Sequence, residues 1–240
     1  MNRRVVRQER IEVDGIVAEV AYKRVRRLTL RVKSSDGPVQ MTVPSRVSRQ
    51  TVKEFLQKQI PWIRKQQQRH KERELVPPPT YAEGETIWMW GRRLVIERVD
   101  AMPPCVTPVG ESGLRLQIAA DATPDECGAV IEEWLRGQLA EAIEPLLETW
   151  SERLGLEVPR YRIRKMKSRW GSCSLRTRTL TFNLELIRRA PTALEYVVVH
   201  ELVHLIVPPH NAGFYAILDR VLPLWSERRR DLNSRPVGMP

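Results

Sequence analysis

The sequence has few cysteines, few aromatic residues and no long apolar segment. Its three cysteines form no CxxC pair, which argues against a disulfide scaffold and indicates a reducing compartment. The longest apolar run, from Tyr196 to Val207, is interrupted by two histidines and a glutamate, so the chain lacks the roughly 20 apolar residues that span a bilayer. Residues 1–15 lack the apolar stretch of a signal peptide. We therefore expect a soluble, cytoplasmic protein with no membrane partner.

Internal repeats, low-complexity tracts, a phosphate-binding P-loop and a carboxylate cluster suited to Mg2+ are also absent from the sequence. Apolar residues are present in sufficient number for a core, because 42% of the chain is hydrophobic and 29% is charged. That composition excludes wholesale disorder and a fibrous repeat. A length of 240 residues allows one large domain or two small ones.

Negative charge is scarce in the first third of the chain. Residues 1–75 hold 19 Lys or Arg and 8 Asp or Glu, a net charge of +11, whereas residues 76–240 hold 21 of each. This excess predicts a polyanionic partner for residues 1–75, which could be a nucleic acid, a nucleotide or an acidic protein. Because aromatic residues that would stack on bases are sparse there, a solvated basic face is the alternative.

The residue pattern predicts a β-rich amino-terminal module. Alternating apolar and polar residues from Gln8 to Val43 indicate a small antiparallel meander. Ser48 is a suitable cap for a following helix, which Pro61 would kink or divide into two. Two short strands joined by a glycine turn are expected at 86–90 and 94–99.

A connection and a long helix follow. The stretch from Met102 to Gly113 is rich in Pro and Gly, so we expect a connection there, with a strand at 114–118. Thr123, followed by Pro124, is placed to cap a helical pattern that reaches about Leu154.

The last third predicts two strands and two helices. Strands are expected at 161–166 and 179–183. A helix that begins at Pro191 contains two of the four histidines and should stop at Pro208. Asn211 is a plausible cap for the next helix.

Three of the four histidines lie within eleven residues, and two of them belong to an H-E-x-x-H motif. His200 and His204 are one turn apart on the expected helix, so both imidazoles project from one face and can share a cation. Neutral imidazoles suit Zn2+, which leaves a position for water when the protein supplies three ligands. Glu201 is adjacent and can take the proton of that water. This arrangement is typical of a zinc-dependent hydrolase with one zinc ion.

The third ligand is open to alternatives. His210 lies ten residues after His200, a spacing found where an H-E-x-x-H helix ends and the chain returns a third histidine. Metzincins make that turn with a glycine, whereas here two prolines would end the helix. We favour His210, with Glu227 or Asp219 on the following helix as the gluzincin-like alternative.

Several motifs resemble those of the YgjP-like metallopeptidase family, which belongs to the zincin group and is related to SprT-like proteases. The motifs are MKSRWGSCS (166–174), LTFNLELIRRAP (180–191) and YVVVHELVHL (196–205), with YKRVRRLTLRV, WIRKQQ and GETIWMWGRRL on the amino-terminal side. The resemblance covers nearly the whole chain. It implies a zincin-like core with a long helix, a short sheet and an H-E-x-x-H active-site helix. It also implies metal ligation by His200, His204 and His210, with Glu201 as the base.

We therefore expect an α+β fold in three parts. A basic β-rich module with a helix would cover residues 1–100, and a connection with a first strand would cover 101–122. The zincin-like catalytic domain would cover 123–240.

The R-W-G-S-C segment is expected to form a turn or edge strand above the active-site helix. An edge strand can bind an extended peptide through backbone hydrogen bonds. Trp170 would then be an apolar wall for substrate, and Arg169 or Lys167 would meet an anionic group. Tyr215 or Arg169 could stabilise the oxyanion. The alternative is that Trp170 belongs to the core and the cations face solvent.

Two other polar residues of this region have expected structural roles. Cys173 is expected to be a small buried residue and not a nucleophile or ligand. Asn183 is expected to orient a loop by hydrogen bonding.

Zinc-dependent peptide-bond hydrolysis with Glu201 as general base is the leading prediction, with a peptide or protein substrate. A zinc-dependent nucleotide pyrophosphatase or phosphohydrolase is one alternative, since the same activated water could attack phosphorus. A protease of SprT-like type, recruited to nucleic acid by residues 1–75, is another. An inert structural zinc site is the least expected, because three ligands and a base leave an open position.

Overall fold

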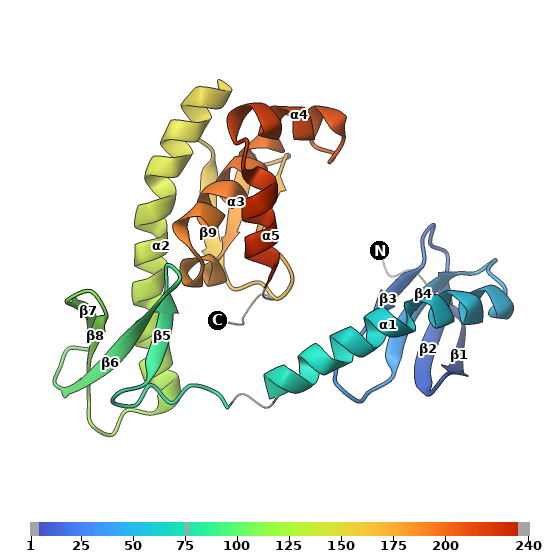
Figure 1. The fold of residues 1–240 in the computed structure, drawn as a ribbon, viewed down its shortest axis with the longest axis horizontal. Helices are drawn as coiled ribbons and strands as arrows, with labels where there is room; N and C mark the ends of the chain where they lie inside the picture. The colour runs from blue at the N-terminus through green and yellow to red at the C-terminus, as the bar shows by residue number, and fades with distance from the viewer. Residues whose placement is uncertain (1–4, 75–76, 235–240) are drawn as a thin grey trace. The chain divides into compact units, whose positions relative to one another are not determined.

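The computed structural model describes residues 5–74 and 77–234, and it forms two compact units that divide between Pro78 and Pro79 (Figure 1). The predicted division after residue 100 differs from this one. The strands at 86–100 belong to the second unit because their buried side chains share its hydrophobic core. No helix in the described ranges is both long and apolar enough to cross a membrane.

The first unit is a four-stranded sheet covered by one helix. Its elements are β1 (Val5–Val13), β2 (Ile16–Lys23), β3 (Thr29–Arg31), β4 (Val39–Pro44) and α1 (Arg49–Glu74). The strand order is β1-β2-β4-β3, with β2 and β4 parallel and the two outer pairs antiparallel. The predicted antiparallel meander is therefore wrong at its centre, because β4 inserts between β2 and β3.

Helix α1 covers one face of this sheet. The Ser48 hydroxyl accepts the Thr51 backbone N–H at 3.1 Å, so the predicted cap is confirmed. The helix continues through Pro61 without dividing. Its side chains in the core of the unit are Val52, Leu56, Ile60 and Ile63. No described α1 residue beyond Ile63 belongs to that core, so the last part of the helix has no apolar face.

A second four-stranded sheet opens the second unit. It consists of β5 (Thr86–Met89), β6 (Arg92–Asp100), β7 (Cys105–Val109) and β8 (Gly113–Ile118), in the order β5-β6-β8-β7. The stretch expected to be a connection therefore contains β7. Its Pro108 is tolerated because β7 is an edge strand.

The two sheets share one topology, although the sequence shows no repeat. In both sheets the two central strands are parallel to each other, and each outer strand is antiparallel to the central strand beside it. A capped helix follows each sheet. Both first hairpins turn through two residues with positive φ, Asp14–Gly15 (48° and 78°) and Trp90–Gly91 (50° and 78°), as in a type I′ turn. Helix α2 (Pro124–Leu154) begins after a Thr123 capping box, in the place that α1 takes after Ser48. The chain therefore contains two ββββα repeats.

The remainder of the second unit has no counterpart among the residues described in the first. It comprises β9 (Arg160–Arg164), β10 (Gly171–Ser174), β11 (Thr179–Asn183), the 3-10 helix η1 (Leu184–Arg188), α3 (Pro191–Val203), α4 (Ala212–Val221) and α5 (Trp225–Ser234). The strands form a sheet of order β10-β11-β9, with β10 antiparallel and β9 parallel to β11. Helix α3 ends at Val203, before the expected Pro208, and continues as a turn.

Helix α2 connects the two halves of the second unit. It contacts β7 and β8 on one side, and η1 and α3 on the other (Figure 1). Its fully buried side chains extend from Cys127 to Trp150. The α+β architecture thus places the histidine helix against a long helix that is apolar over most of its length.

Candidate metal centre

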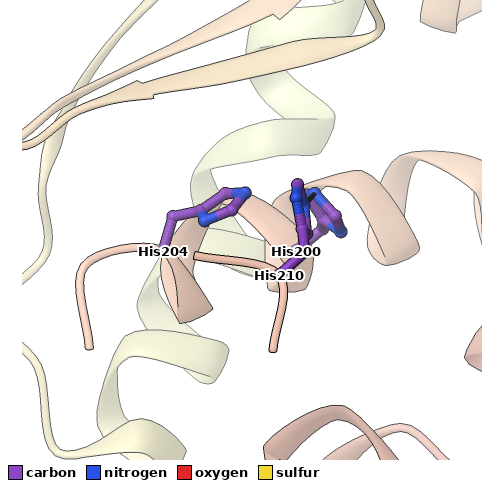
Figure 2. A group of neighbouring side chains, drawn as sticks. All are labelled: His200, His204 and His210. Atoms are coloured by element: carbon purple, nitrogen blue, oxygen red, sulfur yellow. Dashed lines mark hydrogen bonds between the residues drawn. The ribbon is translucent and has the colours of Figure 1, made fainter. Parts of the chain in front are cut away.

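The three clustered histidines converge in space. His200 and His204 lie at the end of α3, and His210 lies in the segment that leads into α4. One ring nitrogen from each lies within 4.8 Å of the others, and the Nε2 atoms of His200 and His210 are 3.0 Å apart. Figure 2 shows the three imidazoles gathered at one point. Their nitrogens are close enough to bind one cation.

Hydrogen bonds leave a free nitrogen on two of the rings. The Pro208 carbonyl oxygen lies 2.9 Å from His204 Nδ1 and can only accept, so Nδ1 carries the proton and Nε2 is free. The Tyr196 hydroxyl lies 3.4 Å from His200 Nδ1, which leaves His200 Nε2 facing the other histidines.

The surroundings favour neutral imidazoles. Burial lowers the pKa of His200 to about 3, and the neighbouring rings of His204 and His210 act in the same direction. Burial and His210 also lower the pKa of His204. Neutral imidazole is the form that binds metal ions, so the site fits a divalent cation with nitrogen ligands.

Phe214 forms an apolar floor under the histidines. It is fully buried, and its ring centroid lies 5.0 Å from that of His200 and 4.7 Å from those of His204 and His210. The Asn211 side chain accepts the Phe214 N–H at 3.1 Å, which confirms the predicted cap of α4. Sequence reasoning gave Phe214 no role; the available signal was its place in the first turn of that capped helix, four residues after His210.

Glu201 lies in the same cavity as the histidines. The residue is only 5% exposed, and its Oε2 atom has no hydrogen-bond partner among the described residues. Burial raises the pKa of its carboxyl group to about 8, while the Arg169 guanidinium acts in the opposite direction. An unpartnered buried carboxyl oxygen is costly in a protein, and because Glu201 lines the cavity, this oxygen is available to a group bound there.

Gly171 on β10 makes room for Glu201. A Cβ atom at this position would lie 2.6 Å from Glu201 Oε1, 2.8 Å from Glu201 Cγ and 2.9 Å from Val197 Cγ1. The predicted edge strand is confirmed, because β10 lies at the edge of its sheet. Glycine at this point therefore allows α3 to lie directly beneath that edge.

A cavity of about 400 Å3 joins the edge strand to the histidines. Its lining includes β10, the three histidines and Glu201, together with Arg169, Leu175 and Pro208. Burial, and the charge of Glu201, raise the pKa of the Cys173 thiol to about 11, so this thiol is not an activated nucleophile. The cavity thus has β10, the imidazoles and Glu201 around one space.

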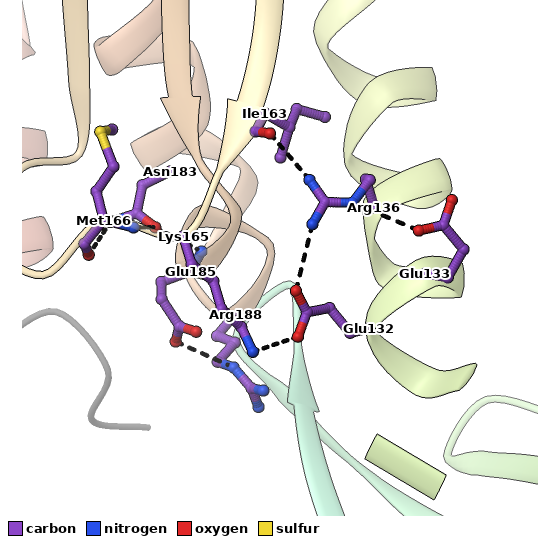
Figure 3. A network of polar contacts seen from close by, with 9 residues as sticks. All are labelled: Glu132, Glu133, Arg136, Ile163, Lys165, Met166, Asn183, Glu185 and Arg188. Carbon is purple, nitrogen blue, oxygen red and sulfur yellow. Dashed lines mark hydrogen bonds and ion pairs between the residues drawn. The ribbon is translucent and has the colours of Figure 1, made fainter. Parts of the chain in front are cut away.

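Asn183 holds the loop that enters β10. Its buried side-chain amide donates to the Met166 carbonyl oxygen at 2.8 Å, and its oxygen accepts the Met166 N–H at 3.1 Å (Figure 3). The amide also donates to the Arg169 carbonyl oxygen at 2.7 Å. The predicted loop-orienting role is thereby confirmed. Asn183 fixes the backbone of Arg169 and so the position at which β10 begins.

Side chains of α2 secure the other end of this loop. Arg136 donates to the Ile163 carbonyl oxygen at 2.9 Å and contacts Glu132 at 3.2 Å, and Glu132 also pairs with Lys165 (Figure 3). The long helix therefore anchors β9 and the loop that follows it.

The other predicted substrate residues occupy different surroundings. Trp170 Nε1 donates to Asn233 Oδ1 at 3.3 Å, the Arg189 guanidinium lies 5.1 Å from its ring, and Trp170 is not among the residues that line the cavity. Tyr215 stacks between His210 and Trp225, with centroid distances of 6.4 and 5.3 Å. Lys167 is exposed and also lies outside the cavity lining.

The carboxylates considered as third ligands lie outside the histidine group. Among the described His, Cys, Asp and Glu residues, His200, His204 and His210 are the group close enough to share an ion. Asp219 accepts the Trp225 indole N–H at 2.7 Å, and Glu227 is not in the group. The geometry thus supports His210 over both alternatives.

Comparison with known proteins identifies the family of the chain. The profile of the YgjP-like family, described as a metallopeptidase domain, matches residues 26–235. No curated protein matches the chain. Among solved structures, the chain is similar to the metallopeptidase zymogen abylysin of Pyrococcus abyssi, with 25% identity, a TM-score of 0.35, and coverage of 40% of this chain and 98% of that one. It is also similar to the zymogen jannalysin of Methanocaldococcus jannaschii, with 22% identity, a TM-score of 0.35, and coverage of 38% and 88%.

Proposed function

Because the chain belongs to the YgjP-like metallopeptidase family, we propose that it is a zinc-dependent metallopeptidase that hydrolyses peptide bonds in a peptide or protein substrate. One observation carries this proposal. The three imidazoles and the unpartnered carboxylate of Glu201 line the same cavity, beneath a sheet edge.

Zn2+ suits the donor set better than Mg2+ or Ca2+ does, since it prefers nitrogen ligands and those ions prefer oxygen. His200, His204 and His210 would hold it and leave a position open. A zinc ion so held would activate water and polarise the carbonyl of the scissile bond.

Glu201 is proposed as the general base. Its carboxylate would take a proton from the attacking water and pass it to the leaving amine. Its burial under β10 raises the pKa of the carboxyl group, which favours holding the proton between these two transfers. Arg169 lines the same cavity, so we assign it, in preference to Tyr215, to the negative charge that develops on the substrate oxygen.

The open edge of β10 is proposed to bind the substrate backbone. An extended peptide can pair with an edge strand through main-chain hydrogen bonds, which places one peptide bond above α3. In this arrangement Trp170 supports β10 by anchoring the loop to α5 and does not contact substrate.

Two substitutions test the proposal. Glu201→Gln should keep metal content and abolish most hydrolysis of a casein-like substrate, whereas Glu157→Gln, at an exposed position outside the site, should keep both. His204→Ala should lose zinc, as measured by elemental analysis, whereas His70→Ala on α1 should not. Full activity in the Glu201→Gln variant, or unchanged zinc in the His204→Ala variant, would refute the assignment.

The same assays address the alternatives from the sequence. Nucleoside triphosphates should be tested in parallel, with and without a chelator. Chelator-sensitive release of phosphate or pyrophosphate without peptide cleavage would establish a phosphohydrolase. Binding of nucleic acid or a nucleotide by the basic residues 1–75 stays a prediction, as does a cytoplasmic location. The binding prediction requires an affinity that falls as salt rises.

A further inference from the structure

Residues 76–240 have no net charge as a whole, but one segment within them is strongly basic. Residues 157–183 hold eight Lys or Arg and one Asp or Glu, a net charge of +7, and this segment forms the three-stranded sheet of the second unit. The remaining residues of 76–240 must therefore be net negative by the same amount. The positive charge of residues 157–183 is therefore balanced by negative charge elsewhere in the second unit.

Strand register places arginines and hydroxyls on one face of that sheet. Arg160, Thr179 and Ser174 are aligned across the three strands, and so are Arg162, Thr181 and Ser172. Residues paired in this way point to the same side of a sheet. The neighbouring row, which includes Leu180 and Phe182, is buried on the opposite side. The hydroxyls and arginines therefore occupy the outer face.

The arginines of this surface are exposed and unpaired. Arg160, Arg162 and Arg164 follow one another on alternate positions of β9, and Arg176 and Arg178 lie in the turn between β10 and β11. None of the five forms an ion pair or side-chain hydrogen bond with the residues that the structure describes. We call these five residues, with Ser172, Ser174, Thr179 and Thr181, the arginine face. Successive β9 arginines are about 7 Å apart along the strand.

We propose that the arginine face binds the phosphodiester backbone of a nucleic acid strand. Guanidinium groups match phosphate oxygens with two parallel hydrogen bonds, and Ser and Thr hydroxyls are frequent phosphate contacts. A row of regularly spaced cations suits a polymer with one charge per residue. The face has no aromatic side chain to stack on bases, so binding should not depend on base sequence.

A peptide partner fits this surface less well. A peptide strand would have to pair with the free edge of β9, but Arg136 of α2 already donates to the Ile163 carbonyl oxygen at that edge. The cavity with the histidines lies mainly against the other side of β10, where Gly171 faces Glu201. Ser172 is the one residue of the arginine face that also lines this cavity. Binding at the arginine face therefore requires no metal, and its test is independent of the proposed peptidase activity.

The test measures the affinity of the 240-residue chain for a fluorescein-labelled single-stranded RNA of about 20 nucleotides, by fluorescence anisotropy at two salt concentrations. The variant replaces Arg160, Arg162 and Arg164 with Gln. The matched control replaces Arg92, Arg220 and Arg230, three exposed arginines on β6, α4 and α5, with Gln. The two variants thus lose the same net charge from different surfaces.

We expect the β9 variant to bind at least about 10-fold more weakly and to reduce the salt slope by about 2 to 3, while the control changes affinity by less than about 2-fold. If the β9 variant does not fold by circular dichroism, Arg176→Gln with Arg178→Gln, in the turn, provides the second measurement. Equal losses in variant and control, or no binding by the wild type, would overturn the proposal. Competition by polyglutamate as strong as by unlabelled RNA would also overturn it, in favour of an acidic protein partner.

Discussion

The two ββββα repeats have the same topology, yet among the described residues only the second supports the candidate metal centre. The difference lies in their helices. Twenty residues after its cap, α1 has the polar residue Gln68, whereas α2 has the fully buried Ile143. Helix α1 contributes no described core residue after Ile63, but α2 buries side chains as far as Trp150. A helix that buries apolar side chains along most of its length can pack against a sheet and against further elements.

The second repeat thus differs from the first in having a helix on which the elements of the candidate site can pack. The second helix supplies a surface on which η1 and α3 rest, and its polar side chains hold β9 and the following loop. The last part of α1 is polar and basic, so an equivalent addition would have nothing apolar to bury.

The largest expected effect is a difference in stability between substitutions at equivalent positions of α1 and α2. Ile143→Ala should destabilise the second unit by about 3 kcal/mol, because it removes buried methyl groups and leaves a cavity between α2 and its neighbours. Gln68→Ala should change stability by less than about 0.5 kcal/mol, since it is a surface substitution on a helix. Calorimetry of both variants measures the difference. Equal destabilisation would contradict the view that the end of α1 lacks a packed face.

The next effect concerns the part of the second unit that the first lacks. Gly171→Ala should lower hydrolytic activity and cost about 1 to 3 kcal/mol, because the added methyl group would overlap Glu201 and Val197. Gly137→Ala on α2, where a Cβ atom meets nothing within 4 Å, is the control and should be neutral or slightly stabilising. The readouts are substrate turnover and the thermal midpoint at equal metal content. Wild-type turnover in Gly171→Ala would show that the contact does not position Glu201.

A smaller effect tests whether the two hairpins are equivalent. Gly15 and Gly91 both have a φ of 78°, which strains any residue with a side chain, and neither site is sterically closed. Gly15→Ala and Gly91→Ala should therefore each cost about 1 kcal/mol or slightly more. Chemical denaturation of each variant gives the two costs. Values that differ by more than about 2 kcal/mol would mean that the turns are not structurally equivalent.

The smallest effect is a loss of stability at low pH that depends on a glutamate in or next to the first strand of each repeat. The Tyr22 hydroxyl donates to Glu9 at 2.6 Å and lowers the pKa of that carboxyl, and the Thr80 hydroxyl lowers the pKa of Glu85 in the second unit. Because the folded-state pKa is below the ordinary value of 4.5, the stabilisation is present above that pH and is lost as pH falls through the lowered value.

We therefore expect Tyr22→Phe to lower stability by at most about 1 kcal/mol at pH 7. The difference from wild type should shrink below about pH 4. Thermal denaturation across this pH range measures it. A difference that does not vary with pH would assign the loss to packing and not to the charge of Glu9.

Local signals in the sequence predicted the local structure well. Ser48, Thr123 and Asn211 were identified as helix caps because a cap depends on residues within one turn. The hairpin at 86–100 and the histidine helix were likewise expected, since their periodicity lies in short segments. The parallel pairing of β2 with β4, the strand β7 and the boundary at Pro78 were not, because each depends on pairing or core contacts between segments distant in the sequence.

The sequence by itself determined the side chains of the candidate site. It supplied two histidines one helical turn apart, an adjacent glutamate and a third histidine after a proline break. Only the tertiary structure decided which residues surround them, because the rotation of α4 and the register of β10 result from packing. That packing brings His210 to 3.0 Å from His200, sets Phe214 beneath the imidazoles and places Gly171 over Glu201. Strand geometry in turn sets Arg160 and Arg162 beside Thr179 and Thr181 on the outer face of the same sheet.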